Sequence, residues 1–250
     1  MNFKGILLLG LVIFLCACKT QKLEKVKLLS PEEQFAQIEI KPGDQAIEIK
    51  FPDGKIWKFM VHFPENPTKY LPLVIGLHWA GGENTYYEYH DCLLKPGLKN
   101  MESILISPQD EQQTWETTYN EEKVLTLIQY ATAYWKIDTD AILVTGYSNG
   151  GNGAWYFAQN HADVFRAAIP MAGAFIPSKK IDIPLFVIHG DQDELFPVKN
   201  TVKSVEMAKE MGTEVVYERA PNKSHFMACD YVLHLRKAVY WFKKNLDPFK

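Results

Sequence analysis

The chain has 250 residues, of which 47% are hydrophobic and 23% charged, and its 27 basic and 30 acidic residues give a formal charge of −3. This composition excludes a disordered or collagen-like chain. The near-neutral balance, without a block of Lys or Arg, argues against nucleic acid as the main partner. One domain is expected, because α/β folds of about 250 residues routinely form a single unit.

The first part of the chain is predicted to be a signal peptide, residues 1–17, with a lysine followed by an apolar run too short to span a membrane. The run ends in LCAC (15–18), which resembles a bacterial lipobox and implies cleavage before Cys18 and a lipid on Cys18. Cys16 fits less well, because a leucine precedes it where a small residue is expected. An ordinary secretory signal or an uncleaved anchor is the alternative. Residues 18–34 are polar and charged and are expected to tether the anchor to the folded domain.

The folded domain is expected over residues 35–250. Its first segment, 35–63, holds three alternating runs separated by Pro/Gly turns, which predicts antiparallel strands. Continuous apolar runs, typical of strands buried on both faces, then alternate with amphipathic helical segments. This alternation predicts an α/β fold with a mostly parallel sheet and helices on both faces. The expected strands cover 71–79, 104–108, 141–148, 166–173, 183–190 and 214–220, and the expected helices cover 120–136, 150–161, 198–211 and 226–244.

The segment GYSNG (146–150) fits the G-x-S-x-G pattern of a nucleophile elbow. It closes a predicted buried strand and opens a predicted helix, which is the context that this motif requires. Ser148 must then sit in a strained turn, so the residues two positions away must be nearly free of side chain. Gly146 and Gly150 meet that demand, and Ser148 is therefore predicted to be a nucleophile.

The acid is expected after a later strand, because in this architecture the catalytic partners follow in the order Ser, acid, His. The segment HGDQDELFP (189–197) follows a predicted strand. Together with the elbow it resembles the α/β-hydrolase superfamily, whose small esterases carry an H-G-x-x-D-x-x-x-P pattern. The resemblance implies Asp193 as the acid. Asp191, which is more typical of a turn, and Glu194 are the neighbours that could be mistaken for it.

The base is found by elimination, because only His225 and His234 of the seven histidines follow Asp193. His234 lies inside the last predicted helix and is expected to be structural. His225 lies in a loop between a strand and a helix, where a mobile base belongs. His225 would accept the proton of Ser148, and Asp193 would hold the tautomer of the imidazole and stabilise the cation that forms.

An oxyanion hole needs two main-chain N–H groups. Asn149 is expected to supply one, and the loop after the strand 71–79 the other. The family usually has His-Gly-x-Gly in that loop, whereas this chain reads HWAGG (78–82). By position Ala80 would donate, with Trp79 as the alternative. Trp79 replaces the usual glycine, which suggests an aromatic wall beside the acyl group.

The resemblance covers about residues 68–245 and is closest to the phospholipase/carboxylesterase branch and to the secreted feruloyl-esterase and polyhydroxybutyrate-depolymerase-like esterases. It implies that Trp115 lies on the rim of the site, with ordinary loop packing as the alternative. Trp79 and Tyr147 are expected to contact substrate, since aromatic faces stack on sugar rings or phenolic acyl groups, or else to belong to the core. The short connection after Ala174 leaves no room for a cap domain, which predicts an open site.

The remaining cysteines are implied by the same resemblance to lie in helices on one face of the sheet. It allows a disulfide between Cys92 and Cys229, with two buried thiols as the alternative, and an exported protein meets an oxidising compartment. The neighbouring triplet HDC (90–92) lacks the spacing of a metal site, so no metal and no cofactor are assigned.

The sequence therefore predicts a serine esterase, anchored by lipid to the bacterial cell envelope on its periplasmic or outer side. It would cleave carboxylic esters through an acyl-enzyme, including acyl groups carried by polysaccharides or other small accessible esters. The main alternative is a serine peptidase on the same fold, and the other is a non-catalytic binding module.

Overall fold

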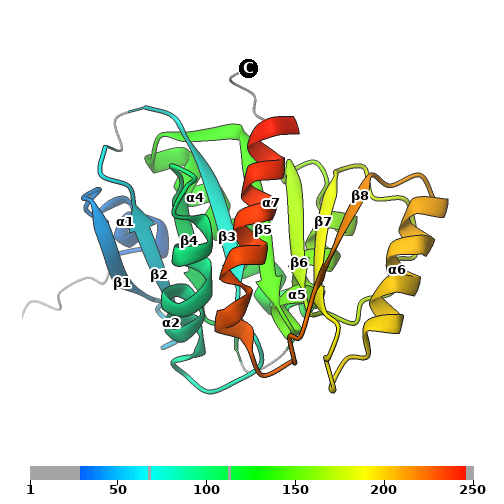
Figure 1. The fold of residues 1–250 in the computed structure, drawn as a ribbon. Helices are drawn as coiled ribbons and strands as arrows, with labels where there is room; N and C mark the ends of the chain where they lie inside the picture. The colour runs from blue at the N-terminus through cyan, green and yellow to red at the C-terminus, as the bar shows by residue number, and fades with distance from the viewer. Residues whose placement is uncertain (1–28, 67–68, 112–113, 246–250) are drawn as a thin grey trace, which may run out of the picture.

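The computed structural model describes residues 29–66, 69–111 and 114–245. The predicted signal peptide, the lipidation site Cys18 and the first part of the predicted tether lie outside the described residues. The elements in chain order (Figure 1) are α1 (Pro31–Ala36), β1 (Gly43–Lys50), β2 (Ile56–Phe63), β3 (Leu71–Leu77), α2 (Thr85–Tyr89), the π-helical turn η1 (His90–Leu94), α3 (Lys95–Leu98), β4 (Ile104–Pro108), α4 (Thr118–Tyr134), β5 (Ile137–Tyr147), α5 (Asn149–Asn160), β6 (Ala167–Met171), β7 (Leu185–Gly190), α6 (Val198–Glu210), β8 (Val215–Ala220), the 3₁₀ turn η2 (Ala228–Tyr231) and α7 (Val232–Asn245).

An eight-stranded sheet in the order β1-β2-β4-β3-β5-β6-β7-β8 forms the centre of the molecule. β1 pairs antiparallel with β2, and β2 pairs antiparallel with β4. All other neighbours, from β4 to β8, are parallel. The chain therefore enters through two antiparallel strands at one edge and then winds a parallel sheet, as the change from alternating to continuous apolar runs predicts.

Helices cover both faces of this sheet (Figure 1). One face packs against α1, α4, α5 and α6, and the other packs against α2, η1, α3 and α7. Burial on both sides explains why the central strands are apolar at nearly every position. Among the described residues, no helix combines the length and the apolar character needed to cross a membrane.

The segment 35–40, expected as a strand, instead contains the end of helix α1. The Ser30 hydroxyl accepts a hydrogen bond from the Glu33 N–H (3.2 Å), and the Glu33 carboxylate accepts one from the Ser30 N–H (2.7 Å). This capping box, followed by a proline at the first helical position, starts a helix despite the alternating pattern. Phe35 is fully buried and stacks on Trp135 with ring centroids 4.7 Å apart. The folded domain therefore begins inside the expected tether.

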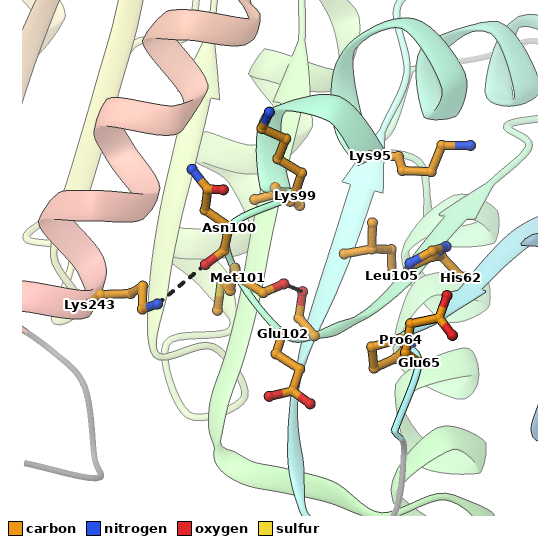
Figure 2. Close-up of a pocket in the computed structure, with 12 residues that line it drawn as sticks. His62, Pro64, Glu65, Lys95, Lys99, Asn100, Met101, Glu102, Leu105 and Lys243 are labelled. Atoms are coloured by element: carbon orange, nitrogen blue, oxygen red, sulfur yellow. Dashed lines mark hydrogen bonds between the residues drawn. The ribbon is translucent and has the colours of Figure 1, made fainter. Parts of the chain in front are cut away.

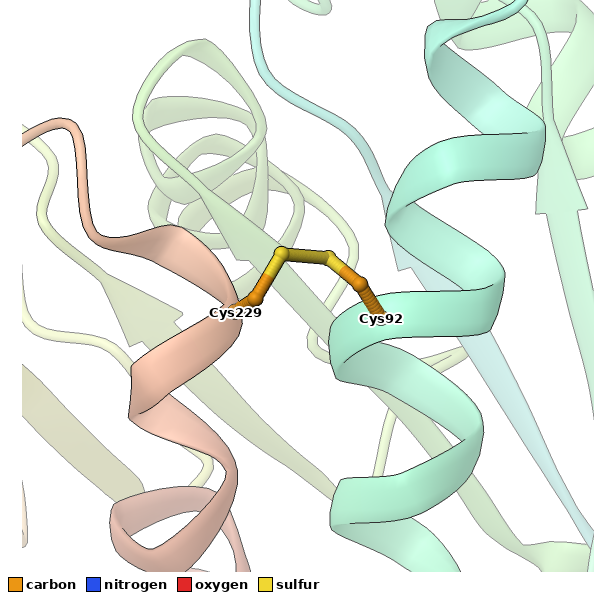
Figure 3. The surroundings of a disulfide bond; sticks show 2 residues. All are labelled: Cys92 and Cys229. Atoms are coloured by element: carbon orange, nitrogen blue, oxygen red, sulfur yellow. A yellow bond between two sulfur atoms is a disulfide. The ribbon is translucent and has the colours of Figure 1, made fainter.

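A disulfide joins Cys92 in η1 to Cys229 in η2, with their Cα atoms 5.1 Å apart (Figure 3). Both turns lie on the same face of the sheet, beside α3 and α7. The bridge links segments 137 residues apart in the chain.

Candidate active site

Ser148 occupies the sharp turn between β5 and α5, with φ 57° and ψ −115°. A non-glycine residue in this region is strained, and such strain is maintained only where the surroundings demand it. Its N–H donates to the Met171 carbonyl of the adjacent strand at 2.9 Å. The turn places Ser148 just beyond the carboxyl end of β5, as the N-cap residue of α5.

The two flanking glycines are required by close approach of the main chain. A Cβ added at Gly146 would lie 2.1 Å from the Gly150 carbonyl oxygen, and one added at Gly150 would lie 1.9 Å from the Leu77 carbonyl oxygen. Both distances are far shorter than any tolerated carbon–oxygen contact, and the atoms met are main-chain atoms that cannot swing away. The G-x-S-x-G spacing is therefore a steric requirement of this turn.

The three residues predicted to form a triad come together in space. Ser148 Oγ lies 2.8 Å from His225 Nε2, and His225 Nδ1 lies 2.7 Å from Asp193 Oδ2. All three residues are buried. An ionised carboxylate can only accept, so the Nδ1–H of His225 donates to it, and Nε2 is left to accept from the Ser148 hydroxyl. A proton path thus runs from the serine to an oriented imidazole.

The Asp193 carboxylate receives hydrogen bonds at both oxygens. Its Oδ1 accepts from the N–H groups of Leu195 (3.0 Å) and Phe196 (2.6 Å), and its Oδ2 faces the imidazoles of His225 and His189. Burial by itself raises the pKa of Asp193, but the hydrogen bonds from the two histidines and from the Phe196 N–H outweigh it and hold this pKa well below its usual range. The carboxylate is therefore ionised at neutral pH.

The neighbouring acids have other partners. Asp191 accepts from the Asn222 N–H at 2.7 Å, as expected of a turn carboxylate. Glu194 accepts from the main-chain N–H of His225 at 3.0 Å and so contacts the base without touching its imidazole. His234 Nδ1 lies 2.8 Å from a Glu218 carboxylate oxygen, which is a structural contact on helix α7.

Tyr147 contacts the main chain of His225, the predicted base. Its hydroxyl donates to the His225 carbonyl at 2.8 Å, and the two ring centroids are 5.7 Å apart. Only 1% of Tyr147 is exposed, although it lines a hollow beside Ser148. The sequence predicts a substrate-binding role for this residue, but the structure uses its hydroxyl on the main chain and leaves a substrate little of its surface.

The loop after β3, which is predicted to supply an oxyanion donor, is held in place by buried His78. Its Nε2 accepts from the Asp110 N–H at 3.1 Å, so its Nδ1–H is the atom that donates to the Trp79 carbonyl at 2.6 Å. Burial lowers the pKa of His78, which favours this neutral form. Ala80 follows and lines the site together with Ser148, and Asn149 lines it from the first position of α5.

Trp115 does not lie on the rim that the sequence predicts for it. The side chain is fully buried, and its Nε1–H donates to the His78 carbonyl at 3.0 Å. A Cβ added at Gly153 of α5 would lie 2.6 Å from the Trp115 Cβ, so the two main chains meet closely there. Trp115 therefore takes the alternative role given above, ordinary packing, because it lies between α5 and the end of β3.

Two hollows of different character meet at Ser148. The first has a volume of about 710 Å³ and combines apolar surface with the polar side chains of Asp110, Thr114 and Asn152, and the second has a volume of about 430 Å³ and is more apolar, with Trp79 and Phe226 in its lining. The first is lined by Ala80, Gly81, Gly82, Asp110, Thr114, Ser148, Asn149, Asn152, Leu195 and Phe196. The second is lined by Trp79, Ala80, Tyr147, Ser148, Leu195, His225, Phe226, Ala228 and Cys229. Ester groups on either side of a scissile bond can therefore occupy chemically distinct surfaces.

Sequence reasoning missed the apolar side chains at the mouth of the site. Leu195 is 52% exposed and lines both hollows, and Phe226 is 77% exposed and lines the second. Their positions carried a signal, because Leu195 lies two residues after Asp193 and Phe226 directly follows His225. Large apolar side chains left exposed beside a site are typical of surfaces that bind a ligand.

A third hollow, of about 630 Å³, lies at the opposite end of the sheet, between α3, β4 and the end of α7 (Figure 2). The Ser103 hydroxyl here donates to the Met101 carbonyl, and His62 binds a carboxylate of Asp44, so serine and histidine are not paired. Lys243 reaches across to the Asn100 carbonyl at 3.2 Å. This hollow lacks the arrangement found at Ser148.

One group among the described residues could hold a metal ion by its spacing, Asp44 with His90 and Asp91. The Lys95 ammonium already contacts both carboxylates of this group. A lysine cation therefore takes the place that a metal ion would need, and the cluster is accounted for as a surface network.

The family model described as "PETase: PET hydrolase-like" matches residues 104–249, which is more than half of the chain. A probable feruloyl esterase C of Aspergillus terreus is 26% identical over 157 residues, which cover 58% of each chain. An uncharacterized secreted protein of Arthroderma benhamiae is 24% identical over 204 residues, covering 62% of this chain and 21% of that one. The chain thus spans less than two thirds of these relatives.

Among solved structures, a fluorophosphonate-binding serine hydrolase of Staphylococcus aureus superposes with a TM-score of 0.68 at 15% identity. The match covers 80% of this chain and 98% of that one. At this identity the likeness concerns the fold, and it confirms the predicted α/β-hydrolase architecture.

Proposed function

The chain belongs to the PET hydrolase-like family. We propose that it is a serine hydrolase that cleaves carboxylic esters through an acyl-enzyme. One observation carries the proposal: an unbroken line of contacts runs from Ser148 through His225 to Asp193 at the junction of two open hollows. The Asp193 carboxylate faces His225 Nδ1, and His225 Nε2 faces the Ser148 hydroxyl.

In the acylation step, Ser148 Oγ attacks the ester carbonyl carbon while its proton moves to His225 Nε2. The imidazolium is stabilised by the ionised Asp193, and the negative oxygen is stabilised by the main-chain N–H groups of Asn149 and Ala80. When the tetrahedral intermediate collapses, the bond from carbon to the alcohol oxygen breaks. His225 then returns its proton to the departing alcohol, leaving the acyl group on Ser148.

In the deacylation step, a water molecule takes the place of the alcohol and loses a proton to His225 Nε2 as it attacks the acyl carbon. The intermediate collapses by breaking the bond to Ser148 Oγ, which regains its proton from His225. A carboxylic acid is released, and the enzyme returns to its starting state. Loss of one oxyanion donor is expected to slow these steps by about 10²–10³-fold.

The substrate is proposed to be a small or polymer-borne ester, such as an acyl substituent on a polysaccharide. Trp79 and Phe226 offer an aromatic wall in one hollow, while Asp110 and Asn152 offer polar groups in the other. An aromatic or short acyl group would suit the first, and a hydroxyl-rich alcohol would suit the second. The similarity to a protein named as a feruloyl esterase supports this class.

The enzyme is proposed to act outside the cytoplasm, held to the bacterial envelope by a lipid on Cys18. The lipobox-like segment 15–18 and the similarity to a protein described as secreted support this location. Incorporation of a labelled fatty acid into the wild type, and its loss in Cys18→Ala, would test the anchor. A matched Cys16→Ala variant should keep the label.

The activity is tested by Ser148→Ala with a panel of acetyl, feruloyl and longer-chain p-nitrophenyl esters. We expect kcat/KM to fall by at least about 10⁴-fold, as when the nucleophile of such a site is removed. Ser178→Ala, which changes an exposed serine hydrogen-bonded to Gln159, should retain wild-type activity. Survival of esterase activity in Ser148→Ala would overturn the proposal. Preferential cleavage of fluorogenic dipeptides by the wild type would favour a peptidase instead.

A further inference from the structure

A second histidine contacts the acid of the site. His189 is the penultimate residue of β7 and is completely buried. Its Nε2 lies 3.2 Å from Asp193 Oδ2 and 2.8 Å from the Phe196 carbonyl oxygen. The mechanism proposed above uses only His225, so the burial of another imidazole against the same carboxylate needs an explanation.

The surroundings of His189 determine which of its nitrogens carries a proton. Nε2 faces a carboxylate and a carbonyl, both of which can only accept, so Nε2 must be protonated. Nδ1 lies 2.8 Å from the Thr201 hydroxyl, which can serve as its partner and is itself buried on α6. That hydroxyl carries one proton, which goes either to Nδ1 or to the Gly173 carbonyl oxygen at 3.1 Å, and in both cases Nε2 keeps its own proton. The Nε2–H therefore faces two acceptors, the Phe196 carbonyl oxygen at 2.8 Å and the Asp193 carboxylate oxygen at 3.2 Å.

His189 connects the carboxylate of Asp193 to strand β7, whereas the other hydrogen bond between Asp193 and this strand is made by the main-chain N–H of Asp193 to the Gly190 carbonyl. The two N–H donors to Oδ1 come from Leu195 and Phe196, in the same loop as the acid. The other partner of Oδ2 is His225, which lies in a loop of its own. Without the imidazole from β7, the carboxylate would be held by its own loop and by the base that it is supposed to orient.

We propose that His189 is a positioning residue, which donates its Nε2–H to Asp193 and so holds the carboxylate in line with the Nδ1–H of His225. The inference rests on the proposed function, since it assigns the orientation of the acid in that same site. The charged and titratable groups near this contact are Asp193, His225, Glu194, Tyr147 and Tyr231.

The kinetic test compares His189→Leu, which fills similar volume without a donor, with His189→Gln, whose amide places a donor near the original Nε2. We expect His189→Leu to lower kcat about 10- to 100-fold, the ratio that one hydrogen bond to a charged group represents, with KM changed less than about twofold. His189→Gln should recover most of this loss. A purely structural role would lower the melting temperature of both variants alike and leave the kcat of the folded fraction unchanged, which would overturn the proposal.

A second measurement does not depend on whether variants at position 189 fold. In the wild type, long-range ¹H–¹⁵N correlation of the histidine rings should show His189 protonated at Nε2, and an unprotonated Nε2 would overturn the proposal. Thr201→Val should lower kcat, whereas Thr201→Ser, which keeps the hydroxyl, should not. A wild type that hydrolyses no ester would contradict the proposed function, whereas an active wild type with an equally active, folded His189→Leu would contradict only this inference.

Discussion

Removal of the disulfide is expected to lower stability strongly while leaving the chemistry nearly intact. The bridge between Cys92 and Cys229 closes a separation of 137 residues. The chain-entropy relation for such a loop corresponds to about 5 kcal/mol at 25 °C, and native disulfides typically contribute about 2–4 kcal/mol. We therefore expect Cys92→Ala/Cys229→Ala to lose about 3–5 kcal/mol of unfolding free energy. At about 2–4 °C per kcal/mol for a domain of this size, its melting temperature should fall by roughly 10 °C.

Activity should persist because His225 is held by contacts that do not pass through the bridge. The Tyr147 hydroxyl donates to the His225 carbonyl, and the His225 N–H donates to Glu194, both from other segments of the chain. The kcat of the double variant at 25 °C should therefore stay within about threefold of the wild type, since neither hydrogen bond is removed.

Urea and thermal unfolding followed by circular dichroism measure the loss, and mass spectrometry of unreduced peptides checks that the wild type holds the linkage between Cys92 and Cys229. Reductant should lower the melting temperature of the wild type and leave that of the double variant unchanged. A loss below about 1 kcal/mol, or equal sensitivity of both proteins to reductant, would refute the reasoning about loop closure.

The remaining predictions concern the elbow and one surface carboxylate. Gly150→Ala should abolish activity and reduce the folded yield, because the added Cβ would lie 1.9 Å from the Leu77 carbonyl oxygen. In the control variant Gly82→Ala the added Cβ meets no atom within 4 Å, so this variant should remain folded. Normal activity in Gly150→Ala would contradict the steric argument. Partial burial raises the pKa of Asp44, but hydrogen bonds from Lys95 and two histidines outweigh it and hold the pKa at about 2. Because this lies below the value of about 3.9 in an unfolded chain, Asp44 should stabilise the fold above about pH 5 and lose this effect as the pH falls towards 2. The free energy of unfolding of Asp44→Asn should thus be lower than that of the wild type by about 1 kcal/mol at pH 7, after allowance for solvent screening. Urea titrations should show this difference vanishing near pH 2. A difference that stays constant with pH would contradict the assignment.

Much of the fold follows from local patterns. Continuous apolar runs mark the parallel strands because a strand covered by helices on both faces has no polar side, and alternating runs mark β1 and β2. The exception is the alternating segment 35–40, where the capping residues Ser30 and Glu33 begin a helix just before it. A short alternating pattern cannot outweigh capping bonds whose donors and acceptors lie a few residues upstream.

The strained serine turn can be predicted from the sequence alone, because Gly146 and Gly150 flank Ser148 in the G-x-S-x-G spacing, although one of the atoms that exclude a side chain there, the Leu77 carbonyl oxygen, comes from β3. Chain order narrowed the candidate base to His225, and the resemblance to the H-G-x-x-D-x-x-x-P pattern of α/β-hydrolase esterases implied Asp193 as the acid. Only the tertiary structure decided that Trp115 is buried under the site and that His189 faces Asp193. Both depend on how segments remote in the chain pack together and on the orientation of a buried side chain. A local pattern of residue types predicts neither.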